Sequence, residues 1–341
     1  MEKGSNIDSA KRLNVVAIGG GNGLSTLLSG LKRFVGQPND EVFSVSRRSA
    51  IVAVTDDGGS SGRLRDELQM LPPGDIRNCM VALSEDSLLL SRLFRHRFTG
   101  SGDLGGHSFG NIFLAALTDL TGDFAEAVRL SSEILASKGH IYPATTANVH
   151  LVAELTDGSI IKGETNISNA GPSIQRLYLD PETCHPMPEA ISAIESADLI
   201  TIGPGSLFTS LLPPLLVHGV ADAVANSLAT RVFVSNLMTQ PGETDRFSAE
   251  RHAEVLNRYA PQIKFDYVLL NSEPTNPEQR RRYAEEGAEQ IGIGEVRSIE
   301  NACGARVVYT NLLRDGEMVR HDPDKLAHAV LSCSAVAEAV G

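Results

Sequence analysis

The chain of 341 residues contains no tryptophan, and only 5% of its residues are aromatic. Proteins that bind single-stranded nucleic acid stack its bases on aromatic side chains, so this composition argues against that function. Basic residues are also in the minority, with 30 Lys and Arg against 42 Asp and Glu and a formal net charge of −12. This balance argues against nucleic acid and anionic membranes as partners. It still allows a small anionic ligand, because backbone amides can bind phosphate without net positive charge.

Cysteines and long apolar runs are scarce as well. Cys79, Cys184, Cys303 and Cys333 are scattered and form no CxxC pair, which predicts a reducing compartment and no structural zinc. No segment approaches the roughly 20 apolar residues that a membrane-spanning helix needs. Residues 1–11 lack the apolar core of a signal peptide and are predicted to form a disordered leader. We therefore expect a cytoplasmic protein.

The rest of the chain alternates between apolar strands and helical segments. β-Branched apolar runs predict strands buried on both faces at residues 13–18, 50–55, 198–202, 231–234, 267–270 and 306–309. Helices are expected at residues 24–34, 76–84, 88–94, from 108 onward, 123–137 and 324–340, with a loop-rich stretch at 56–78.

Residues from about 148 to 180 have a different pattern. Polar and apolar residues alternate there around Asp157-Gly158, which predicts a small antiparallel insert. The predicted fold class is α/β: a doubly wound, Rossmann-like, mostly parallel sheet with this antiparallel insert. Residues 12–341 are expected to form a single nucleotide-binding domain.

The first motif, GGGNGLS, follows the first predicted strand. Consecutive glycines bring backbone N–H groups close to an anion, and the N-terminus of the next helix adds partial positive charge. Gly20, Gly21, Asn22 and Gly23 are therefore candidates for binding a diphosphate. The spacing does not match the dinucleotide fingerprint, and no P-loop lysine follows. A tight turn without a ligand is the alternative.

The second motif, TDDGGSSGR, follows the second predicted strand. Asp56 and Asp57 are carboxylates suited to holding a ribose, coordinating Mg²⁺ or orienting a hydroxyl group. Ser60 and Ser61 suit phosphate oxygens. The alternative is a solvated turn with a capping aspartate.

Two further motifs open helices. In PPGDIRN, Asn78 is a candidate ligand contact, whereas Asp75 is predicted to cap the helix. In GGHSFGN, His107 and Asn111 are four residues apart and are expected on one face of the first turn. A structural role is the alternative for His107.

The last of these motifs, GPGS, follows a strand on the same edge of the predicted sheet. Its Gly205 and Ser206 should therefore face the same crevice as the first glycine loop. Asn236, at the end of a later strand, is a weaker candidate for contact with a base or sugar. No lipase-type elbow, zinc-protease motif or Cys–His pairing is evident, so the chain is expected to bind a ligand rather than to transform it.

Taken together, GGGNGLS, TDDGGSSGRLR, PPGDIRN, GGHSFGN and IGPGSLFTS resemble the YvcK-like gluconeogenesis factors, a family related to the 2-phospho-lactate transferases (CofD-like). The resemblance runs from about residue 14 to 327. It implies a Rossmann-like cytoplasmic protein that binds a UDP-sugar such as UDP-N-acetylglucosamine and controls cell shape, peptidoglycan synthesis and growth on gluconeogenic carbon. It also implies ligand contacts from a C-terminal tyrosine and arginine, placed here at Tyr283 and Arg320.

Three functions remain open at this stage. The first is a UDP-sugar-binding regulator that needs no cofactor and acts on a protein partner of cell-wall precursor metabolism. The second is a phosphotransferase with a nucleoside-diphosphate donor and Mg²⁺, in which Asp56 and Asp57 would be the metal-binding or catalytic residues. The third is a nicotinamide-dependent enzyme, for which the fingerprint is missing. A homo-oligomer is expected, with the apolar run Leu211–Val217 as a candidate interface.

Overall fold

The computed structural model describes residues 11–34, 43–85, 88–170, 174–292 and 296–338. Its centre is a seven-stranded sheet in which each pair of neighbouring strands is parallel. Across the sheet the strands lie in the order β10 (Arg306–Thr310), β9 (Tyr267–Asn271), β8 (Thr230–Val234), β7 (Leu199–Ile202), β1 (Lys11–Gly19), β2 (Phe43–Val52) and β3 (His140–Pro143).

The strand order reverses beside β1. Strands β2 and β3 lie on one side of β1, and β7 to β10 lie on the other. In a doubly wound sheet the loops that leave two such neighbours diverge to opposite faces and leave a crevice between them. The doubly wound α/β prediction is therefore confirmed, and the crevice is expected between the ends of β1 and β7.

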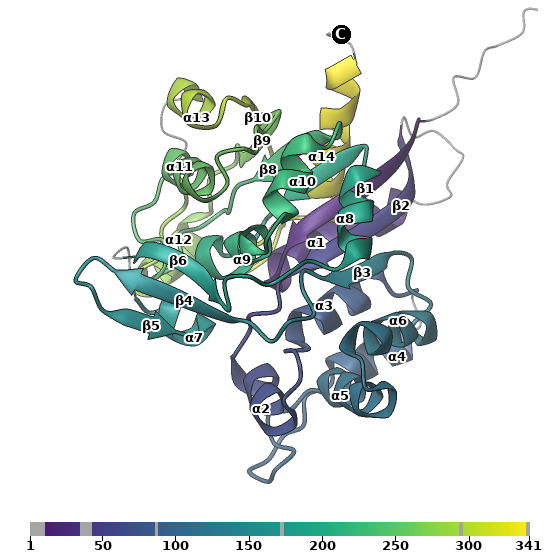
Figure 1. The fold of residues 1–341 in the computed structure, drawn as a ribbon. Helices are drawn as coiled ribbons and strands as arrows, with labels where there is room; N and C mark the ends of the chain where they lie inside the picture. Colours follow the sequence, from purple (N-terminus) through teal and green to yellow (C-terminus); the bar gives the residue numbers. More distant parts are fainter. Residues whose placement is uncertain (1–10, 35–42, 86–87, 171–173, 293–295, 339–341) are drawn as a thin grey trace, which may run out of the picture.

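Helices cover both faces of this sheet (Figure 1). The face behind the sheet in Figure 1 carries α1 (Gly21–Leu31), α3 (Gly74–Leu83) and α14 (Pro323–Glu338). The opposite face carries α8 (Pro188–Glu195), α9 (Leu212–Leu216), α10 (Val220–Asn226), α11 (Ala249–Tyr259) and α13 (Val296–Cys303). Because both faces are covered, central strand residues such as Ile18, Ile51 and Ile200 are completely buried.

The remaining elements lie in the connections between these helices and strands. They are α2 (Gly59–Leu68), α4 (Leu88–Arg95), α5 (Phe109–Thr121), α6 (Phe124–Ile134), α12 (Pro277–Glu285), the 3-10 turn η1 (Lys32–Phe34) and the π-helical turn η3 (Leu207–Leu211).

The antiparallel insert forms as the sequence predicts. Its three strands lie in the order β5 (Ile160–Lys162), β4 (His150–Leu155) and β6 (Ile174–Asp180). The short helix α7 (Glu164–Ile167) follows β5 in the chain and contacts β4 and β5. Asp57 fixes the insert to the main sheet, because its Oδ1 accepts hydrogen bonds from the backbone N–H (2.9 Å) and the hydroxyl (2.7 Å) of Thr165. The insert therefore overhangs the same edge as the predicted crevice.

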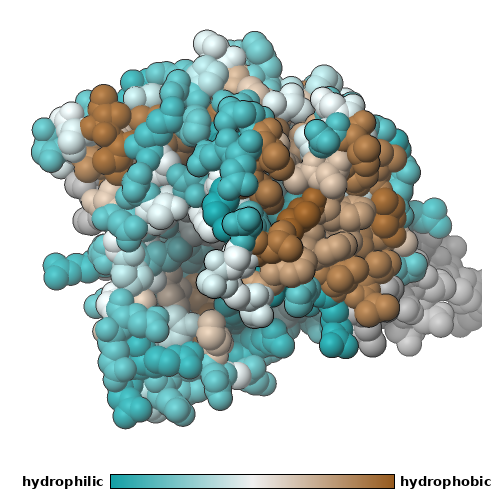
Figure 2. Space-filling model, turned by 90° about the horizontal axis from the view of Figure 1, so that it is seen from below, coloured by the Kyte–Doolittle hydropathy of each residue, from teal (hydrophilic) through white to brown (hydrophobic). Residues whose placement is uncertain are grey.

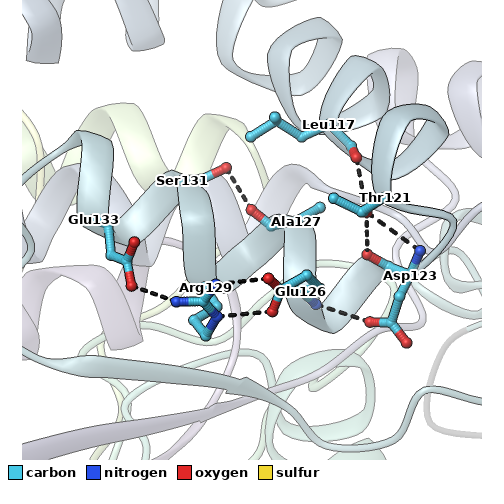
Figure 3. Close-up of polar contacts among 8 residues, drawn as sticks. All are labelled: Leu117, Thr121, Asp123, Glu126, Ala127, Arg129, Ser131 and Glu133. Carbon is cyan, nitrogen blue, oxygen red and sulfur yellow. Dashed lines mark hydrogen bonds and ion pairs between the residues drawn. The ribbon is translucent and has the colours of Figure 1, made fainter.

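A polar corner joins α5 to α6 (Figure 3). The Asp123 carboxylate caps α6 by accepting from the N–H of Glu126 at 2.8 Å, and the Thr121 hydroxyl donates to the carbonyl of Leu117 at 2.8 Å. Arg129 bridges Glu126 and Glu133 along the exposed side of α6. Such exposed ion pairs contribute little to stability, so the capping bonds account for the sharp turn.

Several expectations from the sequence were wrong. The stretch predicted as loop contains α2, because Gly59 to Gly62 continue into a helix rather than a turn. Strand β2 runs at residues 43–52 instead of 50–55, and β3 was missed because it is only four residues long. Residues 1–10 of the predicted leader lie outside the described residues, whereas residue 11 already belongs to β1.

Two smaller expectations also fail. Helix α3 is capped at Pro73, and Asp75 lies inside its first turn instead of at the cap. The apolar run Leu211–Val217 packs inside the fold, with Leu211, Leu212, Leu215 and Val217 all buried, so it provides no subunit interface.

Within the described ranges, no single helix has the length and apolar character needed to cross a bilayer. The bent pair formed by residues 207–216 and 220–226 meets that test together, by length and composition only.

Candidate functional site

A cleft of about 500 Å³ lies at the carboxyl ends of β1 and β7, where the strand order reverses. The loop after β1, the loop after β7, the segment 236–241, helix α12 and the segment 319–321 all contribute to its walls. The predicted ligand residues that line it are Gly20, Gly21, Asn22, Gly23, Asp56, Gly205, Ser206, Asn236, Tyr283 and Arg320. Segments almost 300 residues apart in the sequence thus meet in one place.

The first glycine loop forms the N-terminus of α1. Gly20 is the N-cap and no acidic residue lies in the first turn, so the partial positive charge of the helix end is not neutralised by its own helix. Gly21 has a φ of +63°, which favours glycine. A Cβ on Gly23 would lie 2.2 Å from the carbonyl oxygen of Pro204, so only glycine lets α1 approach the second loop this closely.

Side chains from the segment that follows β8 hold the second glycine loop. The N–H of Gly205 donates to Oδ1 of Asn236 at 3.1 Å, and the Gln240 amide donates to the Ser206 hydroxyl at 2.7 Å. Asn236 thus uses its carbonyl oxygen to shape the loop, and its amide nitrogen has no partner among the described residues. Below the loop, the buried Glu243 carboxyl accepts from the N–H of Phe208 at 2.8 Å.

The C-terminal wall is a small hairpin between β10 and α14. Leu313 pairs with His321, and the N–H of Arg314 donates to the carbonyl of Arg320 at 2.9 Å. The Tyr283 hydroxyl on α12 accepts from the N–H of Val319 at 3.1 Å. Tyr283 therefore holds the segment that carries Arg320, in addition to lining the cleft itself.

His321 lies on this wall and is 8% exposed. Burial lowers its pKa to about 4, although a hydrogen bond with the Ser235 backbone opposes the change, so the imidazole is neutral at pH 7. Its Nε2 has no hydrogen-bond partner among the described residues. A buried polar atom without a partner is costly, so this nitrogen is suited to a ligand in the cleft.

Carboxyl groups gather beside the first glycine loop, where Asp56, Asp75 and Glu164 line the cleft. Burial and the neighbouring Asp56 raise the pKa of Asp75 to about 7, whereas a hydrogen bond from the N–H of Gly21 lowers it. Burial, Asp75 and Asp56 also raise the pKa of Glu164 well above its ordinary value. At pH 7 part of this wall is therefore protonated, and its groups both donate and accept hydrogen bonds.

Other predicted residues do not line the cleft within the described part of the chain. Ser60, His107 and Asn111 form a buried network in which the Ser60 hydroxyl lies 3.0 Å from Nδ1 of His107 and accepts from the Asn111 amide at 3.1 Å. Ser61 is buried beside Gly74 and Asp56. Asn78 lines a neighbouring cavity instead.

Sequence reasoning missed several lining residues, namely Asp75, Glu164, Gln240, Glu286 and His321. Asp75 lies in the PPGDIRN motif, where the sequence predicts a helix cap instead of a ligand contact. Glu164 comes from the insert, and no local pattern indicates that the insert reaches the cleft. For the others the sequence offers no signal, because each stands alone on a charged or polar surface segment.

A Mg²⁺ ion requires several oxygen ligands that converge on one point. Among the described residues, no group of three or more His, Cys, Asp or Glu side chains is arranged to hold a metal ion. Asp57, one of the two expected metal-binding residues, is engaged with Thr165 instead. The residues therefore do not fit a preformed Mg²⁺ site.

The chain is similar to proteins of one family over most of its length. The family model of the 2-phospho-L-lactate transferase CofD matches residues 15–313. The gluconeogenesis factor of Bacillus subtilis is 44% identical over 314 residues, which cover 92% of this chain and 95% of that protein. That of Halalkalibacterium halodurans is 43% identical over 321 residues, covering 94% and 96% of the two chains.

This chain belongs to the CofD-related gluconeogenesis factor family. A crystal structure of a family protein from Bacillus halodurans superimposes with a TM-score of 0.88 at 42% identity, covering 94% of this chain and all of the other. A second crystal structure from the same organism gives a TM-score of 0.87. In this gluconeogenesis factor family member, the parallel sheet with its antiparallel insert is thus the fold of the relatives.

Proposed function

We propose that the chain binds a nucleotide sugar of the UDP-N-acetylglucosamine type in the cleft. One observation carries the proposal: both glycine loops, Tyr283 and Arg320 line the same cleft. These residues belong to separate motifs that lie far apart in the chain, and nothing local in the sequence requires them to meet. A volume of about 500 Å³ lies within the usual range for clefts that bind small molecules and cofactors.

The two walls suit the two halves of such a ligand. The N–H groups at the start of α1, except that of Gly21, which donates to Asp75, are donors for a diphosphate together with Arg320. The carboxyl groups of Asp56 and Glu164 and the free amide nitrogen of Asn236 are partners for sugar hydroxyls and for the edge of a base. The carboxyl groups and the Asn236 amide thus suit the sugar and the base, and the N–H groups and Arg320 suit the phosphates.

We propose a regulatory rather than a catalytic role for this binding. Its support is that Asn236, Ser206 and Gln240, the polar side chains nearest the second loop, are occupied in shaping that loop. The proposal includes control of cell shape, peptidoglycan synthesis and growth on gluconeogenic carbon, in the cytoplasm, through a protein partner of cell-wall precursor metabolism. The relatives' name, gluconeogenesis factor, supports the role in growth on gluconeogenic carbon.

The proposed homo-oligomer or protein partner has a candidate surface. Apolar side chains gather on the underside of the molecule (Figure 2), the side on which α4 and α5 lie in Figure 1. The strongly exposed apolar side chains of these helices are Leu89 and Leu120, at 75% and 80% exposure. Contiguous exposed apolar surface of this kind is typical of protein interfaces.

Calorimetric titration with UDP-N-acetylglucosamine, GDP and NAD, each with and without Mg²⁺, tests the ligand. We expect selective binding of the UDP-sugar, weakened about tenfold or more by Arg320→Ala because a charge-assisted hydrogen bond is lost. Arg306→Ala removes an exposed arginine of β10 outside the cleft and serves as the matched control. Binding of GDP in preference to the UDP-sugar would exclude the proposal.

An alternative function is a phosphotransferase that uses a nucleoside-diphosphate donor and Mg²⁺. The match to the 2-phospho-L-lactate transferase model supports this alternative. Its further support is Asp56, whose carboxyl group lines the cleft and accepts from the N–H of Gly58 at 2.9 Å. This function requires turnover that depends on Mg²⁺ and is lost in Asp56→Asn and Asp57→Asn. Full activity in both variants would remove it.

A further inference from the structure

A second cavity of about 320 Å³ lies behind the cleft, between α1, α3, the end of α4 and the hairpin before α14. It shares Asn22, Thr26, Arg320 and His321 with the cleft, so the two spaces adjoin along this wall. Asn78, Arg95 and Arg314 line the second cavity but not the cleft.

The two spaces differ sharply in charge. Four carboxyl groups and one arginine line the cleft, whereas three arginines and no carboxyl group line the second cavity. This is unusual in a chain with a net charge of −12. An uncompensated positive lining of this kind raises the local concentration of anions.

The three guanidinium groups have no counter-ion in the part of the chain that the structure describes. No ion pair joins Arg95, Arg314 or Arg320 to a carboxylate within the described residues. Arg314 and Arg320 also stand opposite each other in the hairpin, where the backbone N–H of one donates to the carbonyl of the other. Like charges placed directly opposite across two strands are unfavourable, so a bound anion would relieve their repulsion.

Neighbouring groups increase the positive potential. Arg77 on α3 is largely buried, and its pKa is lowered by burial and by the nearby Arg97 and Arg95, although Asp75 and Asp56 oppose this. The Nε of Arg77 has no hydrogen-bond partner among the described residues. A desolvated arginine beside two other arginines is an unfavourable arrangement, and a bound anion would stabilise it.

Hydrogen-bonding groups on the walls are also available. The amide of Asn78 makes no hydrogen bond within the described residues, and it lies on the cavity wall. The buried His321, whose Nε2 has no partner, lies on the wall shared with the cleft. The hydroxyls of Ser25 and Thr26 already donate to the carbonyl of Asn22, so the donors for an anion are the guanidinium groups and the Asn78 amide.

We propose that this second cavity binds a phosphate-type anion through Arg95, Arg314, Arg320 and Asn78. The inference depends on the lining of the second cavity and not on the identity of the nucleotide in the cleft. The anion has two possible sources that share this chemistry: a separate small phosphorylated molecule, or a phosphate group of the cleft's own ligand. Because Arg320 lines both spaces, occupation of one is coupled to the position of this side chain in the other.

Calorimetric titration with inorganic phosphate, in a phosphate-free buffer of constant ionic strength, tests the proposal. The double variant Arg95→Gln/Arg314→Gln removes two cavity arginines that are exposed, so the fold does not depend on them. We expect it to weaken phosphate binding by about tenfold or more, because charge-assisted hydrogen bonds are lost. The matched control is Arg92→Gln/Arg306→Gln, which lowers the net charge equally at exposed positions outside the cavity and should bind phosphate as the unmodified chain does.

A repeat of the phosphate titration with saturating UDP-N-acetylglucosamine distinguishes the two sources. Unchanged phosphate binding supports a separate ligand, whereas exclusion supports a phosphate group of the cleft ligand. Absence of phosphate binding, or equal weakening by both double variants, overturns the proposal. If the chain binds phosphate but none of the nucleotides, the proposed anion site is supported and only the proposed nucleotide-sugar binding is excluded.

Discussion

Replacing Glu243 with glutamine tests how the fold holds a buried carboxyl group beneath the second glycine loop. The Glu243 side chain is 2% exposed, and it accepts hydrogen bonds from the backbone N–H groups of Phe208 and Thr209 at the start of η3. Burial raises its pKa from the ordinary 4.5 to about 7, although these two hydrogen bonds act in the opposite direction. A glutamine keeps an acceptor oxygen for the same N–H groups and never ionises.

The sign of the pH dependence follows from this pKa. Below pH 4.5 the carboxyl is protonated in both folded and unfolded chains and costs nothing. As the pH rises to about 7, the unfolded chain releases this proton before the folded chain does, so the free energy of unfolding falls across this window. A folded-state pKa of about 7 against 4.5 corresponds to about 3 kcal/mol over the whole window.

We therefore expect Glu243→Gln to gain stability relative to the unmodified chain by roughly 2–3 kcal/mol between pH 5 and pH 8. Relief of the neighbouring Glu164, whose pKa is raised partly by Glu243, acts in the same direction. Urea unfolding of both proteins at the two pH values gives this difference, with Glu195→Gln as an exposed control that removes the same charge. A stability difference that does not change with pH would refute the reasoning.

Three further variants test the cleft and its supports. Gly23→Ala places a Cβ 2.2 Å from a backbone oxygen, so it should lower stability by about 1–3 kcal/mol and abolish UDP-sugar binding. Gly102→Ala meets no atom within 4 Å and should be neutral in both assays. Ser60→Ala removes the hydroxyl that His107, Asn111 and the N–H of Ser108 share as a hydrogen-bond partner, and it should lower the free energy of urea unfolding by about 1–3 kcal/mol. An unchanged free energy of unfolding would show that this network is solvated. Tyr283→Phe removes the bond to the Arg320 segment and should weaken nucleotide-sugar binding several-fold by calorimetry, at a stability cost of about 1 kcal/mol; unchanged affinity would show that this bond does not position Arg320.

The sequence by itself determined the layered architecture. Apolar runs such as residues 13–18 and 198–202 indicate strands buried on both faces, which is the property that distinguishes a covered parallel sheet from a solvated one. The sequence also predicts the hairpin around Asp157-Gly158, because its turn residues and the alternation of polar and apolar residues are local properties. The glycine loops were found for the same reason, since a backbone with positive φ or a close approach leaves a trace in residue type.

Only the tertiary structure decided which of these loops share a cleft. Tyr283 and Arg320 line the same cleft as Gly20 because the strand order reverses beside β1. No local sequence pattern predicts this strand order. The same applies to Glu164, which the insert brings to the cleft wall.

Burial separated residues that look alike in the sequence. Ser60, His107 and Asn111 lie in or next to glycine-rich motifs, as Ser206 does. They nevertheless form hydrogen bonds with one another inside the fold, whereas Ser206 and Asn236 line the cleft. The arginines of the second cavity come from α4 and from the hairpin before α14, more than 200 residues apart in the chain. Residue type and spacing specify local backbone and burial, whereas the meeting of distant charges depends on how the whole sheet and its helices pack.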